Sequence, residues 1–469
     1  MLIAVVVVYF VVTILAGVYF TGRARSASDF LIAGRQLGLP LTTATLAAIQ
    51  LGAGVVIGGA ELGAESGIWP GVWYGLGCGG GLILAGLLVA AKLRRLGGIV
   101  PLDFFGERYG EMRGVRIWGW VSNIPSLLGI FVAQIMAAGS IFRVFGFDYT
   151  TGVIVCGIVI MLYSVMGGMW AVAATNLIQV GIIVIGIPLV AVMALLELGE
   201  IGTVTAGSII STPFIPPGMF SRAVFIIVPF LIAVTVSYDA FMRYQSARSE
   251  AVAKWGCIFA GIIVILISLC IGLVGAIGRV VFPDLESAAV LPMMIQETLP
   301  PVLAGLVVAA LLAAAMSTGN CLLLSLAGCF SRDLYNKVLN PWAEIDELKH
   351  TKLISRIVIV CSLVVGVLIA FRGGGILYTI IIFNYPYMGS MLVPLLGGVL
   401  WKGATVKGAL AAILVGGAIG VFSFLAGMPG PLNGLINVDL GLFVAYAVSA
   451  LVFVGVSLMT SGPGLEPAR

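Results

Sequence analysis

Neutral oxygen atoms suited to a small cation interrupt an apolar stretch in the second half of the chain. Ser317 and Thr318 are adjacent within Ala314–Asn320, a break in a run of alanine and leucine. Hydroxyls and helix carbonyls can replace the water around a hard cation such as Na+ without leaving a net charge behind when the ion departs. Alternatively, both hydroxyls bond back to carbonyls of their own helix, as is common in membrane helices. The residues alone leave both interpretations open.

Four ionisable side chains occur inside apolar stretches, in two pairs with helical spacing. Glu61 and Glu65 are four residues apart and share one helix face, as do Asp239 and Arg243. Intramembrane charges by default indicate function. If the acids contact a bound molecule, they favour one with a positive charge, such as an amine, a quaternary ammonium compound or an amino acid. The alternatives are a structural Asp239–Arg243 pair and, for the two glutamates, a solvated entry vestibule.

Two apolar stretches contain segments that disfavour a continuous helix. Residues 50–59 include four glycines, each costing about 1 kcal/mol in a helix interior, and Pro229 precedes the weak helix formers Val234–Ser237. In hydrocarbon a helix can unwind only where its freed backbone groups face protein, water or an ion. We therefore expect a binding site at these two segments, although each could also be a packing or kink region of an ordinary span.

Polar residues near these segments complete the set of candidate contacts. Gln134 and Asn384 place amides in apolar runs, and Tyr387 adds a ring that can equally pack at a helix interface. The residues predicted to face a bound small molecule are Gln50, Gly54, Glu61, Gln134, Tyr238, Asp239, Asn384 and Tyr387.

The elements that must position these residues follow from composition. Of 469 residues, 61% are apolar and 9% charged, against about 45–50% and 25% in soluble domains. This excludes a soluble enzyme and indicates a chain embedded in a lipid bilayer. The net charge of +4 is too dispersed for nucleic-acid binding, which needs a clustered basic face.

Cysteine and histidine give no metal or cofactor chemistry. The seven cysteines lack CxxC spacing, and His350 is the single histidine, so no transition-metal ligand set is present. We predict no catalytic residues and no bound cofactor. No appended module or obligate protein partner is evident.

Runs of about 20 apolar residues predict thirteen membrane helices. They lie near 2–22, 39–67, 72–91, 117–145, 150–168, 175–198, 223–243, 253–282, 302–330, 353–371, 376–401, 408–426 and 440–459, and the longest loops are 199–222 and 331–352. With the N-terminus outside, only Arg143, Arg222, Arg279 and Arg372 of the 24 basic residues face outward. The excess of basic residues on cytoplasmic loops supports this orientation.

Several ordered motifs resemble the sodium:solute symporter family, which includes proline, pantothenate, sialic acid, glucose and choline carriers. The motifs are Ala33–Gly38, Gly167–Val172 leading to Thr175–Gln179, Arg243–Arg248, Pro300–Thr318, Ser331–Tyr335 and Trp401–Thr405 with Gly408. The resemblance covers essentially the whole chain.

The resemblance implies an all-α fold with two inverted five-helix repeats, like that of the LeuT transporters. The repeats would span 39–198 and 223–401, with helices 2–22, 408–426 and 440–459 peripheral, in one transporter domain of residues 1–469. It also implies a sodium site made by the carbonyls of Ala48, Leu51 and Ala314 and the hydroxyls of Ser317 and Thr318.

One departure bears on the coupling ion. Many family members have Thr-Asp in the sixth span, where this chain has Thr175-Asn176. The neutral amide removes a charge that an additional cation site would use, which favours one Na+ per solute and disfavours proton coupling. The positions matched to the aromatic cage of choline carriers are mostly non-aromatic here (Gln50, Cys78 and Ile130), so choline is not favoured.

These observations predict Na+-coupled symport of a small organic solute: an amino acid, an amine or quaternary ammonium compound, or a monocarboxylate. The protein would sit in the cell membrane with Na+ as coupling ion. The alternatives are a sodium-independent or proton-coupled carrier of the same fold, or a channel, although no filter-like sequence is visible.

Overall fold

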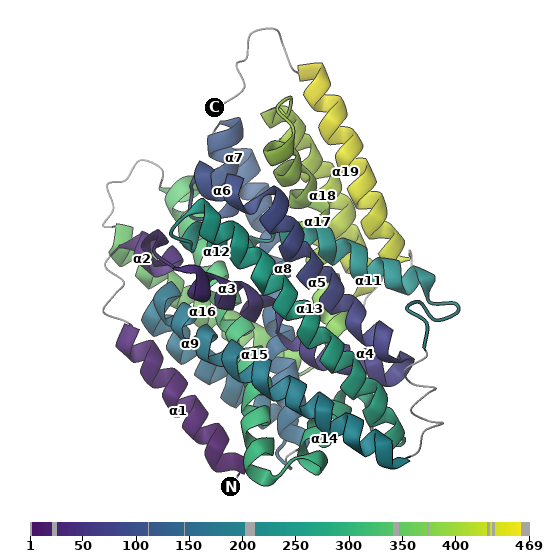
Figure 1. Ribbon diagram of the computed structural model, residues 1–469. Coiled ribbons are helices and arrows are strands. Elements are labelled where there is room, and N and C mark those ends of the chain that lie inside the picture. Colours follow the sequence, from purple (N-terminus) through teal and green to yellow (C-terminus); the bar gives the residue numbers. More distant parts are fainter. Residues whose placement is uncertain are drawn as a thin grey trace.

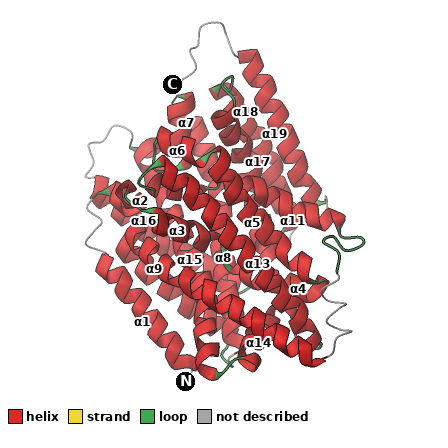
Figure 2. Ribbon diagram, in the orientation of Figure 1, coloured by secondary structure: helices red, strands yellow, loops and turns green. Residues whose placement is uncertain are grey.

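The computed structural model describes residues 2–20, 26–110, 112–144, 146–201, 212–340, 347–372, 375–428, 432–433 and 437–460. Within these ranges the secondary structure is entirely helical (Figure 2). The all-α prediction is therefore confirmed for the described part of the chain.

The first half of the chain forms the following elements, labelled in Figure 1: α1 (Leu2–Phe20), α2 (Ala27–Ile32), η2 (Ala33–Arg35), α3 (Leu39–Gln50), η3 (Gly54–Gly58), α4 (Gly59–Ser66), α5 (Ile68–Leu88), α6 (Ala90–Leu96), α7 (Pro101–Tyr109), α8 (Arg113–Val144) and α9 (Tyr149–Ile201).

The second half forms α11 (Phe220–Ala233), η4 (Val234–Val236), α12 (Tyr238–Ser246), α13 (Glu250–Val281), η5 (Ser287–Ala289), α14 (Val290–Thr298), α15 (Pro301–Gly328), η6 (Cys329–Leu339), α16 (Glu347–Ala370), α17 (Ile376–Leu400), α18 (Val406–Gly427) and α19 (Val438–Thr460).

Nine described helices are long and apolar enough to cross a membrane, or up to eleven if each of two bent pairs is one span. Two shorter apolar segments, Val7–Ala16 and Tyr149–Leu162, coincide with the predicted first and fifth spans. All thirteen predicted positions are thus helical, whereas the count of thirteen crossings and the outside N-terminus stay predictions.

Four short helices were not expected from the sequence. Helices α2, α6, α7 and α14 lie between predicted spans, because they are too short or too polar for the apolar-run criterion. The range α9 contains two helices that meet at a kink at Gly168, whose φ of 56° and ψ of −156° are not helical, so the predicted spans 150–168 and 175–198 stay separate apolar segments. The predicted loop 331–352 is wrong over residues 331–339, where η6 continues α15.

Helix α15 lies in the middle of the bundle, with α1 and α19 on opposite sides (Figure 1). Every residue from 307 to 328 is buried. Its small alanine and glycine side chains let α3, α8, α9 and α16 pack against it, which is how membrane helices associate without a hydrophobic driving force. The Ser317–Thr318 pair is therefore held at the centre of the molecule.

Both predicted breaks occur. Helix α3 ends at Gln50 and is bent by 54° relative to Gly54–Ser66, while the α11–η4 segment is bent by 41° relative to α12. The first break continues as a π-helical turn, η3, and the second is centred on Ser237, which has extended backbone geometry (φ −57°, ψ 148°). Each bend frees backbone groups inside the bundle.

Candidate functional site

Five oxygen atoms meet where α15 passes the first break. The Thr318 hydroxyl oxygen lies within hydrogen-bonding distance of the carbonyls of Ala48 (2.8 Å), Ile49 (3.2 Å) and Ala314 (3.2 Å). The Ser317 hydroxyl lies 3.4 Å from the Ala48 carbonyl and 3.0 Å from that of Ala314. Both hydroxyls therefore contact their own helix and also reach α3, while a cation at this position stays a prediction.

This oxygen cluster has the chemistry that Na+ requires. All its members are neutral and buried, and a hard cation prefers several oxygen ligands. Ala48, Ala314, Ser317 and Thr318 are brought together as predicted, and Ile49 adds an oxygen that the sequence did not indicate. Leu51 directly follows α3, and its place in the ligand set stays a prediction.

Gln134, on α8, forms a hydrogen bond with the backbone at the first break. Its Oε1 accepts a hydrogen bond of 2.7 Å from the Ala53 amide, and its Nε2 donates to the Ile130 carbonyl at 3.0 Å. A Cβ at Gly52 would come within 2.5 Å of Thr318 Oγ1 and 2.7 Å of Gln134 Oε1. Glycine at position 52 is thus what allows α8 and α15 to approach the unwound backbone together.

A small cavity of about 50 Å³ lies between the two breaks. Its polar lining groups are Gln50, Ser237, Asp239, Thr318 and Asn384, and its aromatic ones are Tyr74, Phe230 and Tyr387. We call this cavity the central pocket. Because Thr318 lines the pocket and also belongs to the oxygen cluster, the two sites adjoin.

Asp239 and Arg243 do not form the salt bridge that their spacing allowed. The Arg243 guanidinium donates instead to the Asp239 carbonyl (2.8 Å), the Ser325 hydroxyl (3.3 Å) and the Cys321 carbonyl (3.4 Å). Asp239 is 5% exposed and lies in the first turn of α12, where the Ala240 amide donates to the Ser237 hydroxyl at 3.4 Å. It faces the central pocket.

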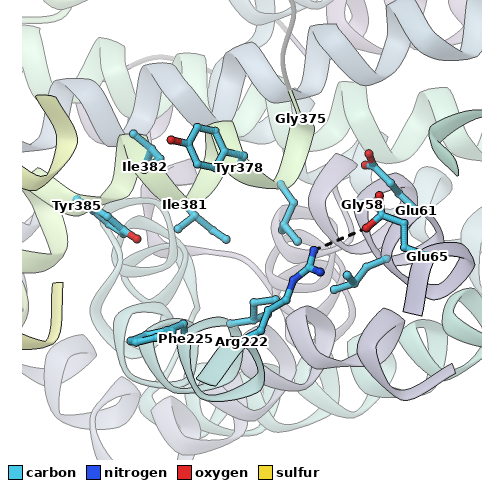
Figure 3. A pocket seen from close by; sticks show the side chains of 13 residues that line it. Gly58, Glu61, Glu65, Arg222, Phe225, Gly375, Tyr378, Ile381, Ile382 and Tyr385 are labelled. Carbon is cyan, nitrogen blue, oxygen red and sulfur yellow. Dashed lines mark ion pairs between the residues drawn. The ribbon is translucent and has the colours of Figure 1, made fainter. Parts of the chain in front are cut away.

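A larger cavity of about 290 Å³ lies toward the end of the bundle that carries α14 (Figure 3). Glu61, Glu65 and Arg222 line it, and Arg222 pairs with Glu65 at 3.7 Å. Glu61 also borders a cavity of about 440 Å³ that contains Arg143 and Arg372. Glu61 therefore lies in a vestibule at this end, separate from the central pocket.

A buried charge cluster closes the opposite end, near α7. Arg116 Nη1 lies 3.2 Å from Asp333 Oδ1, and Arg116 Nη2 lies 3.1 Å from Asp103 Oδ1. Tyr238 donates to Asp333 Oδ2 at 2.9 Å. Arg116, Asp103 and Asp333 are at most 5% exposed. This cluster, Asp103–Arg116–Asp333–Tyr238, joins α7, α8, η6 and α12.

The Asp103 carboxyl on α7 is outside the candidate spans, and its charge state follows from its neighbours. Burial alone would raise its pKa, but the charges of Arg332 and Arg116 outweigh burial and lower it. The Ile99 amide also donates to Oδ2, at 2.9 Å. Asp103 is therefore an anion at neutral pH and holds the Arg116 charge.

Of the residues predicted to face a small molecule, Gln50, Asp239, Asn384 and Tyr387 line the central pocket. Gly54 is next to it, since a Cβ there would lie 2.7 Å from the Tyr74 ring. Gln134 braces the break, Glu61 lies in the vestibule, and the Tyr238 hydroxyl points to Asp333 rather than into the central pocket.

Sequence reasoning missed Tyr74, Phe230, Arg116 and Asp333. Tyr74 and Phe230 come from apolar faces of α5 and α11, with ring centroids 4.7 Å apart. Nothing in their local sequence marks them. Arg116 and Asp333 are 217 positions apart, so their pairing appears only in three dimensions.

Two bent helices inside a helical bundle, with neutral oxygens at one break, define the class of membrane transporters that bind solute between unwound helices. The profile of the sodium:solute symporter family matches residues 30–416. The chain belongs to this family, and it is a multi-pass protein of the cell membrane.

Curated relatives and solved structures agree with this assignment. The chain is 28% identical to a sodium/pantothenate symporter of Escherichia coli K12, with 88% of each chain covered. It is 26% identical to a sodium/proline symporter of Staphylococcus aureus JH9, covering 98% of this chain and 93% of the relative.

Among solved structures, a Na+-coupled sialic acid symporter in a substrate-bound outward-open state superposes with a TM-score of 0.79 at 20% identity, with 98% of each chain covered. A closed nucleobase-cation-symport-1 family transporter with bromovinylhydantoin bound gives a TM-score of 0.61 at 17% identity, covering 94% of this chain and 96% of that one. At these identities the matches show the fold. The named relatives are transporters, so at the family level the chain's chemistry is transport rather than catalysis.

Proposed function

We propose that the protein couples the inward movement of one Na+ to the uptake of a small organic solute by alternating access. The oxygen cluster at Ala48, Ala314, Ser317 and Thr318 carries this proposal, because it joins the last turn of α3, next to the first break, to the centre of α15. An ion there would tie the two elements together and stabilise the arrangement in which the central pocket can fill.

The distribution of charge supports an orientation with the α7 end in the cytoplasm. Arg35, Arg94 and Arg108 make their hydrogen bonds at that end, to Gly98, Ala247 and Gly398 respectively. The four basic residues predicted to face outward lie around the vestibule: Arg222 pairs with Glu65, Arg279 donates to Ala64, and Arg143 and Arg372 border the cavity of Glu61. Such a bias is typical of membrane proteins.

In this orientation the vestibule opens outward and the charge cluster closes the cytoplasmic side. Solute would enter past Glu61 and bind in the central pocket. Release to the cytoplasm would require α12 to separate from η6, which means breaking the Tyr238–Asp333 hydrogen bond.

A single sodium per solute is favoured by the surroundings of Asn176. Its Nδ2 contacts Cys321 Sγ at 3.4 Å, and the Thr175 hydroxyl donates to the carbonyls of Ala171 and Val172. No carboxylate is present at this position to attract a second cation.

Substitution of Thr318 tests the sodium site. Thr318→Ala removes one neutral oxygen from a set of about five or six ligands, so the Na+ concentration for half-maximal stabilisation of the purified protein should rise about tenfold or more, at ~1.4 kcal/mol per tenfold. Thermal unfolding in NaCl against KCl at equal ionic strength measures this.

Ser423→Ala is the matched control for this experiment. Ser423 is equally buried, but its hydroxyl donates only to Ile419 of its own helix α18. The control should keep wild-type sodium dependence. Unchanged sodium dependence in Thr318→Ala would remove the proposed site.

A further inference from the structure

The central pocket contains one acid and no base. Among its described lining residues only Asp239 carries a formal charge. None of the ion pairs among the described residues includes Asp239, and the Arg243 guanidinium is engaged by a carbonyl of α12 and two groups of α15. The charge of Arg243 acts on the carboxylate without a direct ion pair. A cation bound in the pocket would give this buried acid the direct ion pair that it lacks among the described residues.

Two backbone amides at the breaks are already hydrogen-bonded to side chains. Helix N-termini are ready-made sites for carboxylates because their amides point at the ligand. Here the Ala53 amide is already bonded to Gln134 Oε1 at 2.7 Å, and the Ala240 amide is bonded to Ser237 Oγ at 3.4 Å. The Asp239 carboxylate itself lies at the start of α12. A solute carboxylate would meet capped amides and a like charge.

Aromatic rings supply the remaining wall of the pocket. Tyr74 and Phe230 pack edge to face with ring centroids 4.7 Å apart, and Tyr387 lines the same space. The Tyr387 hydroxyl donates to the Val236 carbonyl, so this residue presents its ring rather than a free donor. Ring faces attract ammonium groups within about 6 Å.

We infer that the transported solute is a small organic cation without a carboxylate, whose ammonium group binds between Asp239 and the rings of Tyr74 and Phe230. This inference rests on the proposed function and narrows its solute class. It selects the amine among the three classes that the sequence left open. The cavity of about 50 Å³, room for a few waters, limits the cation to a few carbon atoms.

Three probes with one common isopropyl group separate the charge types: isobutylamine as cation, valine as zwitterion and isovalerate as anion. Each is titrated against the purified full-length protein in NaCl, with thermal unfolding as readout. Isobutylamine should raise the unfolding temperature, and its midpoint concentration should be at least tenfold lower than that of valine or isovalerate. Stabilisation by isovalerate or valine in preference to the amine would overturn the inference.

Substitution of Asp239 then tests whether the ammonium group binds at this carboxylate. Asp239→Asn should weaken isobutylamine binding at least tenfold, and Asp239→Glu should restore part of it, while both variants keep the stabilisation by Na+ alone. Glu65→Gln, in the vestibule, should bind the amine as wild type does. Wild-type amine affinity in Asp239→Asn, or its loss in Glu65→Gln, would contradict a site at Asp239.

The two proposals fail in different ways in this experiment. Loss of the Na+ effect in the wild-type protein would contradict the sodium site whatever the amine does. A retained Na+ effect without amine selectivity would contradict only the solute class.

Discussion

At the first break, the side chain of Gln134 provides a hydrogen-bond acceptor for a backbone amide that has no partner in its own helix. Its side chain is 1% exposed and satisfies the Ala53 amide, which has lost its helical partner because α3 ends at Gln50. A buried amide without an acceptor costs about 1–3 kcal/mol. The unwound backbone therefore depends on an amide from a different helix.

Gln134→Leu should lower the free energy of unfolding by about 1–3 kcal/mol and reduce the affinity for Na+, since Gly52 and Thr318 adjoin this amide. Gln134→Glu keeps the acceptor and should be milder in its effect on Na+ binding. Chemical unfolding and sodium titration of both variants provide the check. A leucine variant with wild-type sodium affinity would show that Gln134 does not hold the break.

Individual residues were predictable where their type was unusual for its surroundings. The hydroxyl pair, Asp239 and the amides of Gln50 and Asn384 stood out against apolar runs, and all of them lie at the central site. Tyr74 and Phe230 did not stand out, because aromatic residues are common in membrane helices. Their role depends on the packing of α5 against α11.

In the proposed function, the two broken helices are the elements that move, and the contacts of α7 and α12 hold the α7 end closed. Tyr238 on α12 donates to Asp333 on η6, which is held by Arg116 of α8. A change at Tyr238 removes one hydrogen bond from an uncharged donor and no charge, whereas loss of Asp333 would leave Arg116 partly unpaired at a cost of up to about 3–5 kcal/mol. Tyr238 is therefore the better position at which to weaken the closure.

Tyr238→Phe should shift the protein toward the inward-open state. Cys329 is fully buried beside Tyr238 and serves as a native reporter: its alkylation from the α7 side should become several-fold faster in the variant. Saturating Na+ should slow the reaction in both proteins, because the ion favours the outward-open state.

Tyr446→Phe is the control for that measurement. The Tyr446 hydroxyl is buried and has no hydrogen-bond partner among the described residues, so its removal should leave the alkylation rate of Cys329 unchanged. Equal rates in Tyr238→Phe and the wild-type protein would mean that the hydrogen bond to Asp333 does not keep the cytoplasmic side closed.

The positions of the two helix breaks were predictable from the sequence, whereas the Asp103–Arg116–Asp333–Tyr238 cluster was not. Four glycines in residues 50–59 and the Val234–Ser237 segment indicated where helices end, and the bends occur there. Helix α7 positions Asp103 in the cluster, but its nine residues are too few and too polar to be recognised as a membrane span from the sequence. Its contacts depend on the tertiary arrangement.

At the scale of the whole molecule, charged side chains among the described residues gather at the two ends and at a few buried positions. Arg35 and Arg94 lie with the α7 end, and the vestibule at the other end holds both signs of charge. The oxygen cluster between them is neutral. An ion can therefore bind and leave at the centre without stranding a charge in the bilayer, which is what a carrier driven by an ion gradient needs.

Uptake into proteoliposomes is the decisive experiment, with radiolabelled isobutylamine or whichever of the three probes stabilises the protein. An inward Na+ gradient should drive accumulation that saturates with solute and is stimulated by solute inside, as expected of a carrier. A pH gradient without Na+ should give uptake near background. Robust uptake driven by protons alone, or non-saturating flux, would contradict sodium-coupled symport.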